Sequence, residues 1–301
     1  MMDYPRVLVG GKEGERPEAR EFVDVLVVCG QGVYANGTYF GEFHDRDVYF
    51  DHAIRFPEVA KRFNFDTVVL SGGFTQPRAP WRSEAESFLD ILRDANVPVP
   101  TGTVILDECA LDSAENLLLG LMTARLALGK TRIRRVGIWA AWRFKKWRFN
   151  RNAEALGIVE RTYVYGLAGS GETNIQVPPE DQKQRTFDEY RQDSIEFSLL
   201  RAKDKEDKRR KRWQNNRVDA SRDGSINALA EGGPRSWSRR LSDDGTPETH
   251  FDGKTCSLYR HRFAPFDVFP TVSKALKLMG NGATADEADL KSAWAREVMG
   301  D

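Results

Sequence analysis

The chain has few cysteines and lacks a long apolar run. Its three cysteines, Cys29, Cys109 and Cys256, are far apart and form no CxxC pair. An odd number of distant cysteines disfavours a disulfide framework and is typical of reduced thiols in the cytoplasm. No stretch approaches the roughly 18 apolar residues of a membrane-spanning helix, and residues 1–20 lack the apolar core of a signal peptide. The sequence therefore predicts a cytoplasmic chain without membrane insertion.

Net charge is also absent, because 45 basic residues balance 45 acidic ones. Overall charge therefore predicts no polyanionic partner. A basic run at 208–212 lies close to three acids, Asp204, Glu206 and Asp207. We interpret this run as a solvated helix end, and nucleic acid is not an expected partner.

What the sequence does contain is a regular alternation of short apolar runs and helical patterns. Strands are predicted at 23–29, 66–70, 103–106, 135–140 and 159–164. Helices are predicted at 51–63, 84–95 and 113–128 and in a segment ending near Gly157, with Pro57 kinking or splitting the first. This alternation implies right-handed crossovers. The predicted fold class is α/β, a doubly wound, mainly parallel sheet with helices on both faces.

The character of the chain changes after this region. Residues 179–213 have the pattern of a long, increasingly charged helix. The following segment, 215–252, is rich in Gly, Ser, Asn, Arg and Asp, a composition that predicts a mobile segment. Apolar patterning returns from Leu258, and Thr284 is a plausible cap for a last helix. We therefore expect the main α/β domain to be followed by a charged helical C-terminal extension.

Glycine turns follow the first two predicted strands, at the edge where open parallel sheets bind ligands. Gly30-Gln31-Gly32 closes the first strand and Ser71-Gly72-Gly73 closes the second. Glycine lets backbone N–H groups approach a phosphate or carboxylate closely. Tight turns require glycine as well, so each motif alone is compatible with a plain turn.

Two predicted helices begin with groups of polar residues. These are Ser83 and Glu84 in one helix, and Asp112, Ser113, Glu115 and Asn116 in the other. Capping by serine and aspartate explains part of the pattern. It does not explain Asn116, a weak helix former in a first turn. Alternatively, Glu84, Glu115 and Asn116 face the cleft and bind ligand hydroxyls, amines or a metal, and both interpretations stay open.

A basic aromatic stretch follows the fourth predicted strand, with four cations among four aromatic residues at 142–149. Cations are unfavourable near a helix N-terminus unless an anion binds there. Arginine can also grip phosphate through two parallel hydrogen bonds. The pattern predicts that Lys145 and Arg148 bind the anionic group of a ligand.

Taken in order, these motifs over about residues 23–164 resemble the YdcF/SanA/ElyC-like family, a domain family of unknown function. The resemblance implies a Rossmann-like fold and a nucleotide-like small-molecule ligand, with S-adenosylmethionine as one kind. At Asp107 the family usually has Glu, and at Lys145 it usually has His. Histidine can shuttle protons near neutral pH, whereas an ordinary lysine remains a fixed charge. With this resemblance the chain divides into an N-terminal extension (1–22), a YdcF-like α/β domain (23–200), a charged helix end and mobile linker (201–257) and a small helical C-terminal segment (258–301).

The functional hypothesis is a cleft that binds a phosphorylated or nucleotide-like small molecule at the carboxyl ends of the strands. In it the two glycine motifs cradle the ligand, the helix-start residues orient it or handle protons, and Lys145 and Arg148 hold its anionic group. Two versions stay open. One is a hydrolase of phosphate esters or anhydrides, with Glu84, Glu115 and Lys145 as catalytic residues. The other is a non-catalytic module that binds S-adenosylmethionine or a nucleotide.

The sequence identifies no metal site and no cofactor. His44, Asp45, Asp47, Asp51 and His52 have metal-ligand side chains, but their spacing matches no recurring metal scaffold. A polar loop and helix start is the favoured interpretation. A divalent metal is still compatible with the hypothesis, and the oligomeric state is not predicted.

Overall fold

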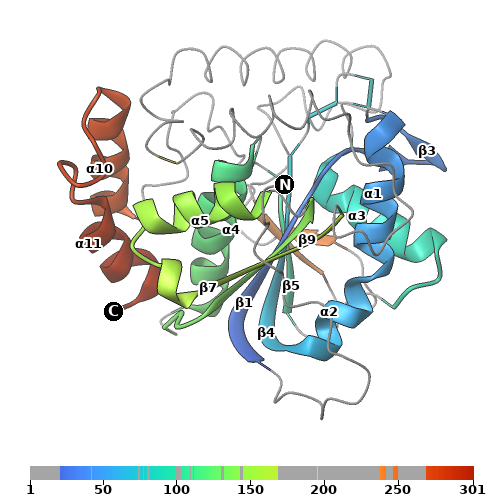
Figure 1. The fold of residues 1–301 in the computed structure, drawn as a ribbon, viewed down its shortest axis with the longest axis horizontal. Helices are drawn as coiled ribbons and strands as arrows, with labels where there is room; N and C mark the ends of the chain where they lie inside the picture. Colours follow the sequence, from blue (N-terminus) through green and yellow to red (C-terminus); the bar gives the residue numbers. More distant parts are fainter. Residues whose placement is uncertain are drawn as a thin grey trace, which may run out of the picture.

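The structure is a computed structural model centred on a five-stranded parallel sheet (Figure 1). It describes residues 21–41, 43–73, 75–76, 78–79, 82–98, 103–108, 110, 112–129, 132–142, 145–168, 195, 238–241, 247–249 and 269–301. The parallel strands are β1 (Glu21–Cys29), β4 (Phe63–Ser71), β5 (Thr103–Asp107), β6 (Val136–Trp142) and β7 (Thr162–Ala168). They are ordered β7-β6-β1-β4-β5.

Helices cover both faces of this sheet (Figure 1). One face carries α1 (Phe43–Ile54), α2 (Phe56–Arg62) and α3 (Glu84–Asp94). The other carries α4 (Ser113–Leu128), α5 (Lys145–Ala155), α10 (Pro270–Gly280) and α11 (Leu290–Trp294). The predicted doubly wound α/β fold is confirmed. Alternate residues of β1 supply the two cores, because successive strand side chains point to opposite faces: Val25 and Val27 pack under α4, and Leu26 and Val28 under α1 to α3.

The winding of the sheet reverses beside β1. From β1 the chain proceeds outward through β4 to β5, and α4 then carries it back to β6 on the other side of β1. β1 and β6 are neighbours in the sheet, but the loop after β1 leads to α1 on one face and the loop after β6 leads to α5 on the other. The two loops therefore diverge. In open α/β sheets such a reversal forms the crevice in which ligands bind.

The local signals in the sequence account for the main element boundaries. α1 and α2 are separated at Arg55, with Pro57 in the first turn of α2, so the proline splits the predicted helix. Ser83 caps α3 and Asp112 caps α4. Gly129 ends α4 with a positive φ, as a helix-terminating glycine commonly has.

A small hairpin that was not predicted follows the first glycine loop. It consists of β2 (Tyr34–Ala35) and β3 (Thr38–Tyr39), joined by an Asn-Gly turn at 36–37 in which both residues have positive φ. A Cβ atom on Gly32 would lie only 2.5 Å from the Tyr39 hydroxyl oxygen. The hairpin thus folds back onto the loop, and Gly32 permits that approach.

Two short strands, β8 (Ser238–Leu241) and β9 (Pro247–Thr249), extend the sheet beyond β5 in antiparallel orientation. They fall within 215–252, where the composition gave no strand signal. The long charged helix predicted at 179–213 lies outside the described residues, apart from the buried Ile195. Within the described parts of the chain, no helix is both long and apolar enough to cross a membrane.

The C-terminal helices belong to the same core as α4 and α5. Leu276 of α10 and Trp294 of α11 are buried in one apolar cluster with Leu117 and Ile138. The chain after α11 continues as η3 (Ala295–Met299). There the Glu297 carboxylate accepts hydrogen bonds from two backbone N–H groups at the start of α10, at 2.8 and 2.9 Å. The C-terminal segment is thus docked by apolar packing and by a capping carboxylate.

Candidate functional site

The carboxyl ends of three strands are tied together by a buried polar network. Cys29 of β1 pairs in register with Ser71 of β4, which pairs with Asp107 of β5. The Ser71 hydroxyl donates a hydrogen bond to Asp107 Oδ2 at 2.7 Å, and Asn116 Oδ1 lies 3.2 Å from the same hydroxyl. All four side chains are buried. The first-turn asparagine therefore belongs to this network, and capping is not its role.

The Cys29 thiol marks where several of the predicted site residues converge. Burial raises its pKa from 9.0 to about 12. Lys145 and the Asn116 side chain lower that pKa by smaller amounts, whereas Glu84 and Asp107 raise it. Four groups from four different segments thus act on one buried sulfur atom. The thiol itself stays protonated at neutral pH and packs as part of the core.

The glycine loops do not form the predicted cradle through the amides of Gly30, Gly72 and Gly73. These three N–H groups donate to the carbonyl oxygens of Ser71, Asp107 and Ala110, respectively, at 2.7, 2.9 and 2.6 Å. A backbone N–H that is used within the protein is not available to a ligand phosphate. Any contact of a ligand with these glycines must use other atoms.

Close packing explains why glycine occupies these positions. A Cβ atom on Gly30 would lie 2.5 Å from Glu84 Cβ, and one on Gly72 would lie 2.7 Å from it. A Cβ atom on Gly73 would lie 2.6 Å from the Glu108 carbonyl oxygen. The start of α3 and the segment after β5 thus approach the strand ends more closely than any side chain would allow.

Two cations at the start of α5 reach across the point where the sheet reverses. Lys145 is only 8% exposed, and its ammonium group donates a hydrogen bond to Gln31 Oε1 in the loop after β1. Arg148 Nη1 donates to the hydroxyl of Ser113, in the first turn of α4, at 2.9 Å. The predicted cationic residues therefore join three elements around one corner of the sheet.

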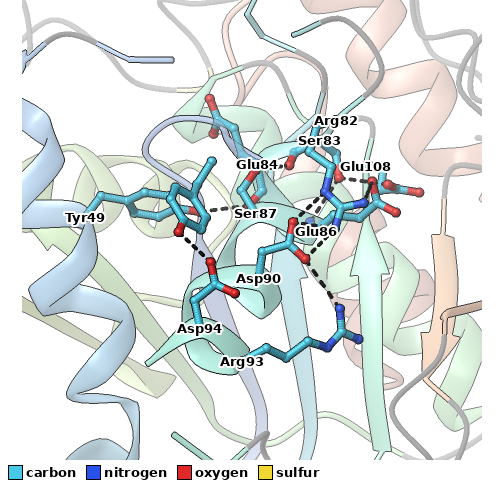
Figure 2. Close-up of polar contacts among 11 residues, drawn as sticks. Tyr49, Arg82, Ser83, Glu84, Glu86, Ser87, Asp90, Arg93, Asp94 and Glu108 are labelled. Atoms are coloured by element: carbon cyan, nitrogen blue, oxygen red, sulfur yellow. Dashed lines mark hydrogen bonds and ion pairs between the residues drawn. The ribbon is translucent and has the colours of Figure 1, made fainter. Parts of the chain in front are cut away.

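The start of α3 is fixed by a capping serine that also contacts a buried acid (Figure 2). Ser83 Oγ accepts a hydrogen bond from the Glu86 N–H at 3.0 Å and donates one to Glu108 Oε1 at 2.8 Å. Glu108 is buried, as is Asp107 beside it. Neither acid was among the predicted site residues. Their position at the carboxyl end of a strand was the signal that could have identified them.

An ion-pair network holds the outer side of α3 (Figure 2). Arg82 Nε donates to Asp90 Oδ2 at 2.7 Å, and an Arg82 terminal nitrogen lies 3.4 Å from Glu86 Oε2. Burial raises the pKa of Asp90, although the Arg82 guanidinium opposes this shift. The network connects the segment before α3 to the middle of the helix.

The start of α4 shows that one predicted ligand-binding acid is a helix cap. Asp112 Oδ1 accepts hydrogen bonds from the backbone N–H groups of Ala114 and Glu115, both at 3.0 Å. The Glu115 side chain is buried in the same turn. The capping interpretation of Asp112 is therefore confirmed. Asp112 and Ser113 still adjoin the corner that Arg148 reaches.

The assembled site brings acids from α3, α4 and the end of β5 and cations from α5 to the carboxyl ends of the strands. In the described part of the chain, no group of three or more His, Cys, Asp or Glu side chains is arranged to hold a metal ion. Comparison of the chain with protein-family models, curated proteins and solved structures gave no match.

Proposed function

We propose that the chain binds a phosphorylated or nucleotide-like small molecule at the carboxyl edge of the parallel sheet. Lys145 and Arg148 hold the anionic group of this ligand. The observation that carries the proposal is the contact of Lys145 with Gln31, which joins the loops after β6 and β1 where they diverge. Ligands of open α/β sheets bind at this place.

The electrostatics of the corner also support an anionic ligand. Both α4 and α5 begin there, and helix N-termini carry partial positive charge. Lys145 and Arg148 add two full positive charges in the first turn of α5. Positive charge concentrated at a helix start stabilises a phosphate or carboxylate that binds there.

Recognition rests on side chains, because the amides of three of the loop glycines are used within the protein. Lys145, Gln31, Arg148 and Ser113 form the anion-binding corner in this proposal. Glu84 adjoins the same loop at Gly30. The corner is thus a preorganised set of donors drawn from the β1 loop, α4 and α5.

Two activities fit such a corner. A hydrolase would bring water to phosphorus with Glu84 as the base. A non-catalytic module for S-adenosylmethionine or a nucleotide would only bind its ligand. Lysine at position 145, where the resembled family usually has histidine, favours the module, because an ordinary lysine does not shuttle protons near neutral pH. Incubation of each bound ligand followed by product analysis distinguishes the two activities.

Replacing Arg148 by alanine is expected to weaken binding of anionic ligands about 10- to 100-fold, because a hydrogen bond to a charged group contributes about 1.5–3 kcal/mol. The measurement is a thermal-shift screen of phosphate esters, nucleotides and S-adenosylmethionine, followed by calorimetric titration of the compounds that bind.

Arg151→Ala is the matched control. Arg151 lies on α5 as well, but it is exposed and pairs with Glu154 of the same helix, with 3.9 Å between Nη1 and Oε2. Its replacement is expected to leave affinity unchanged. Equal affinities of the wild type and Arg148→Ala would remove Arg148 from the site and contradict the proposal.

A further inference from the structure

We infer that the ligand carries hydroxyl groups beside its anionic group, as a ribose phosphate does, and that Glu84 accepts hydrogen bonds from these hydroxyls. This inference rests on the proposed function, because it names the class of molecule that the same corner selects. It is carried by the position of the Glu84 carboxylate relative to the glycine loops and to Lys145.

The Glu84 side chain lies directly against the loop that Lys145 also contacts. Its Oε2 atom is 2.6 Å from the position that a Cβ atom would take on Gly30, and 2.9 Å from the corresponding position on Gly72. Gln31, the partner of Lys145, is the next residue in the chain. A carboxylate and an ammonium thus flank the same short stretch of backbone.

The carboxylate is held in place before any ligand arrives. The Tyr49 hydroxyl donates to the Glu84 carbonyl oxygen at 2.8 Å, and the Glu84 N–H donates to the Gly73 carbonyl oxygen at 3.1 Å. The Thr75 hydroxyl donates to Oε1. In Figure 2 the Glu84 side chain points away from Arg82 and Asp90. The Thr75 hydroxyl and the hydrogen bonds of the Glu84 backbone therefore help to orient this carboxylate.

An ionised carboxylate only accepts hydrogen bonds, and it offers about four acceptor positions. The hydroxyl of Thr75 already uses Oε1 in this way. In dinucleotide-binding sheets, an acid near the strand ends accepts the ribose hydroxyls while the phosphate binds at a helix start. A ligand made only of anionic groups would be repelled by the same carboxylate. A carboxylate and an ammonium that both adjoin Gly30-Gln31 therefore select a molecule with both an anionic and a hydroxyl-bearing part.

The test is calorimetric titration of the full chain with three probes: AMP, 2′,3′-dideoxy-AMP and inorganic pyrophosphate. The wild type is expected to bind AMP about tenfold or more tightly than the dideoxy analogue, the loss typical of hydrogen bonds to a charged acceptor. Glu84→Gln is expected to reduce this ratio to about threefold or less. The same variant is expected to bind pyrophosphate more tightly, because one repulsive charge is removed.

Glu86→Gln is the matched control, since Glu86 lies in the same first turn but belongs to the Arg82 network. It should keep the wild-type ratio between AMP and its dideoxy analogue. Should Glu84→Gln fail to fold, the ratio in the wild type still decides. Equal affinities of the wild type for AMP and the dideoxy analogue, both weakened by Arg148→Ala, overturn this inference and leave the proposed function intact. Absence of binding of all three probes to the wild type overturns both.

Discussion

Leu276→Ala is expected to lower the free energy of unfolding by about 2–5 kcal/mol, the usual cost of emptying a buried leucine site. Leu276 lies on α10, is 1% exposed and packs in the cluster that also contains Leu117 of α4 and Ile138 of β6. Removing its side chain loses apolar burial and leaves a cavity between the C-terminal helices and the sheet. Urea unfolding of the wild type and variant measures the difference.

Leu278→Ala on the same helix is the control for this prediction. Leu278 is 43% exposed, so its truncation is expected to cost well under about 1 kcal/mol. A similar small loss for both variants would contradict the docking of α10 onto the main core. The contrast therefore tests whether residues 269–301 stabilise the α/β domain.

His52→Phe is expected to reduce the loss of stability in acid. The folded protein holds the His52 ring neutral, because burial, with a further contribution from Lys145, lowers its pKa from 6.5 to about 3. The backbone of Cys29 offsets only part of this shift. The ring is enclosed by aromatic side chains, among them Trp139 with centroids 5.2 Å apart and Phe88 at 5.5 Å.

The sign of the pH effect follows from this lowered pKa. Below pH 6.5 the unfolded chain takes up a proton on His52, whereas the folded chain does not until about pH 3. The stability that His52 contributes above pH 6.5 is thus lost as the pH falls, by about 1.4 kcal/mol per pH unit. By about pH 4.5 the loss amounts to about 2–3 kcal/mol.

The measurement is urea unfolding of the wild type and His52→Phe at pH 8 and at about pH 4.5. At pH 8 the variant should differ by less than about 1.5 kcal/mol, since one buried ring replaces another. Acid should then destabilise the wild type by about 2–3 kcal/mol more than the variant. Equal acid losses in the two proteins would contradict the neutral, buried state of His52.

Local sequence patterns were sufficient to predict the architecture. The apolar run at 23–29 and the glycine after it identified β1, Pro57 identified the break between α1 and α2, and Ser83 identified the start of α3. Each of these signals acts within a few residues of its own position. A parallel sheet with helices on both faces then follows from the alternation of strands and helices.

The packing of the site was not predictable in the same way, because it depends on contacts between distant residues. The sequence pattern around Gly30 and Gly72 predicted anion-binding turns. In the structure, the absence of a Cβ atom at each glycine allows the Glu84 side chain to pack closely against it. Asn116 joins a network with Ser71, which lies 45 residues away in the chain. The hydrogen bond between Lys145 and Gln31 spans 114 residues. The register of the strands and the packing of α3, α4 and α5 on the sheet bring these groups together.

The pairing of β8 with β5 is a further case in which tertiary contacts override local composition. The strand Ser238–Leu241 contains two adjacent arginines and lies in a segment rich in polar residues. It pairs with β5 on one side and with β9 on the other, so backbone hydrogen bonds hold it within the sheet. Backbone pairing does not require an apolar side-chain pattern, so nothing in the local composition indicated this strand.

A crystal structure of the chain with AMP tests the central claim most directly. We expect the phosphate at the carboxyl edge of the sheet, within ion-pair distance of Lys145 or Arg148. The protein offers an alternative cationic position, where Arg132 and Arg161 bind the Asp301 carboxylate. A phosphate bound there, with the corner formed by Gln31, Lys145 and Arg148 empty, would contradict the account.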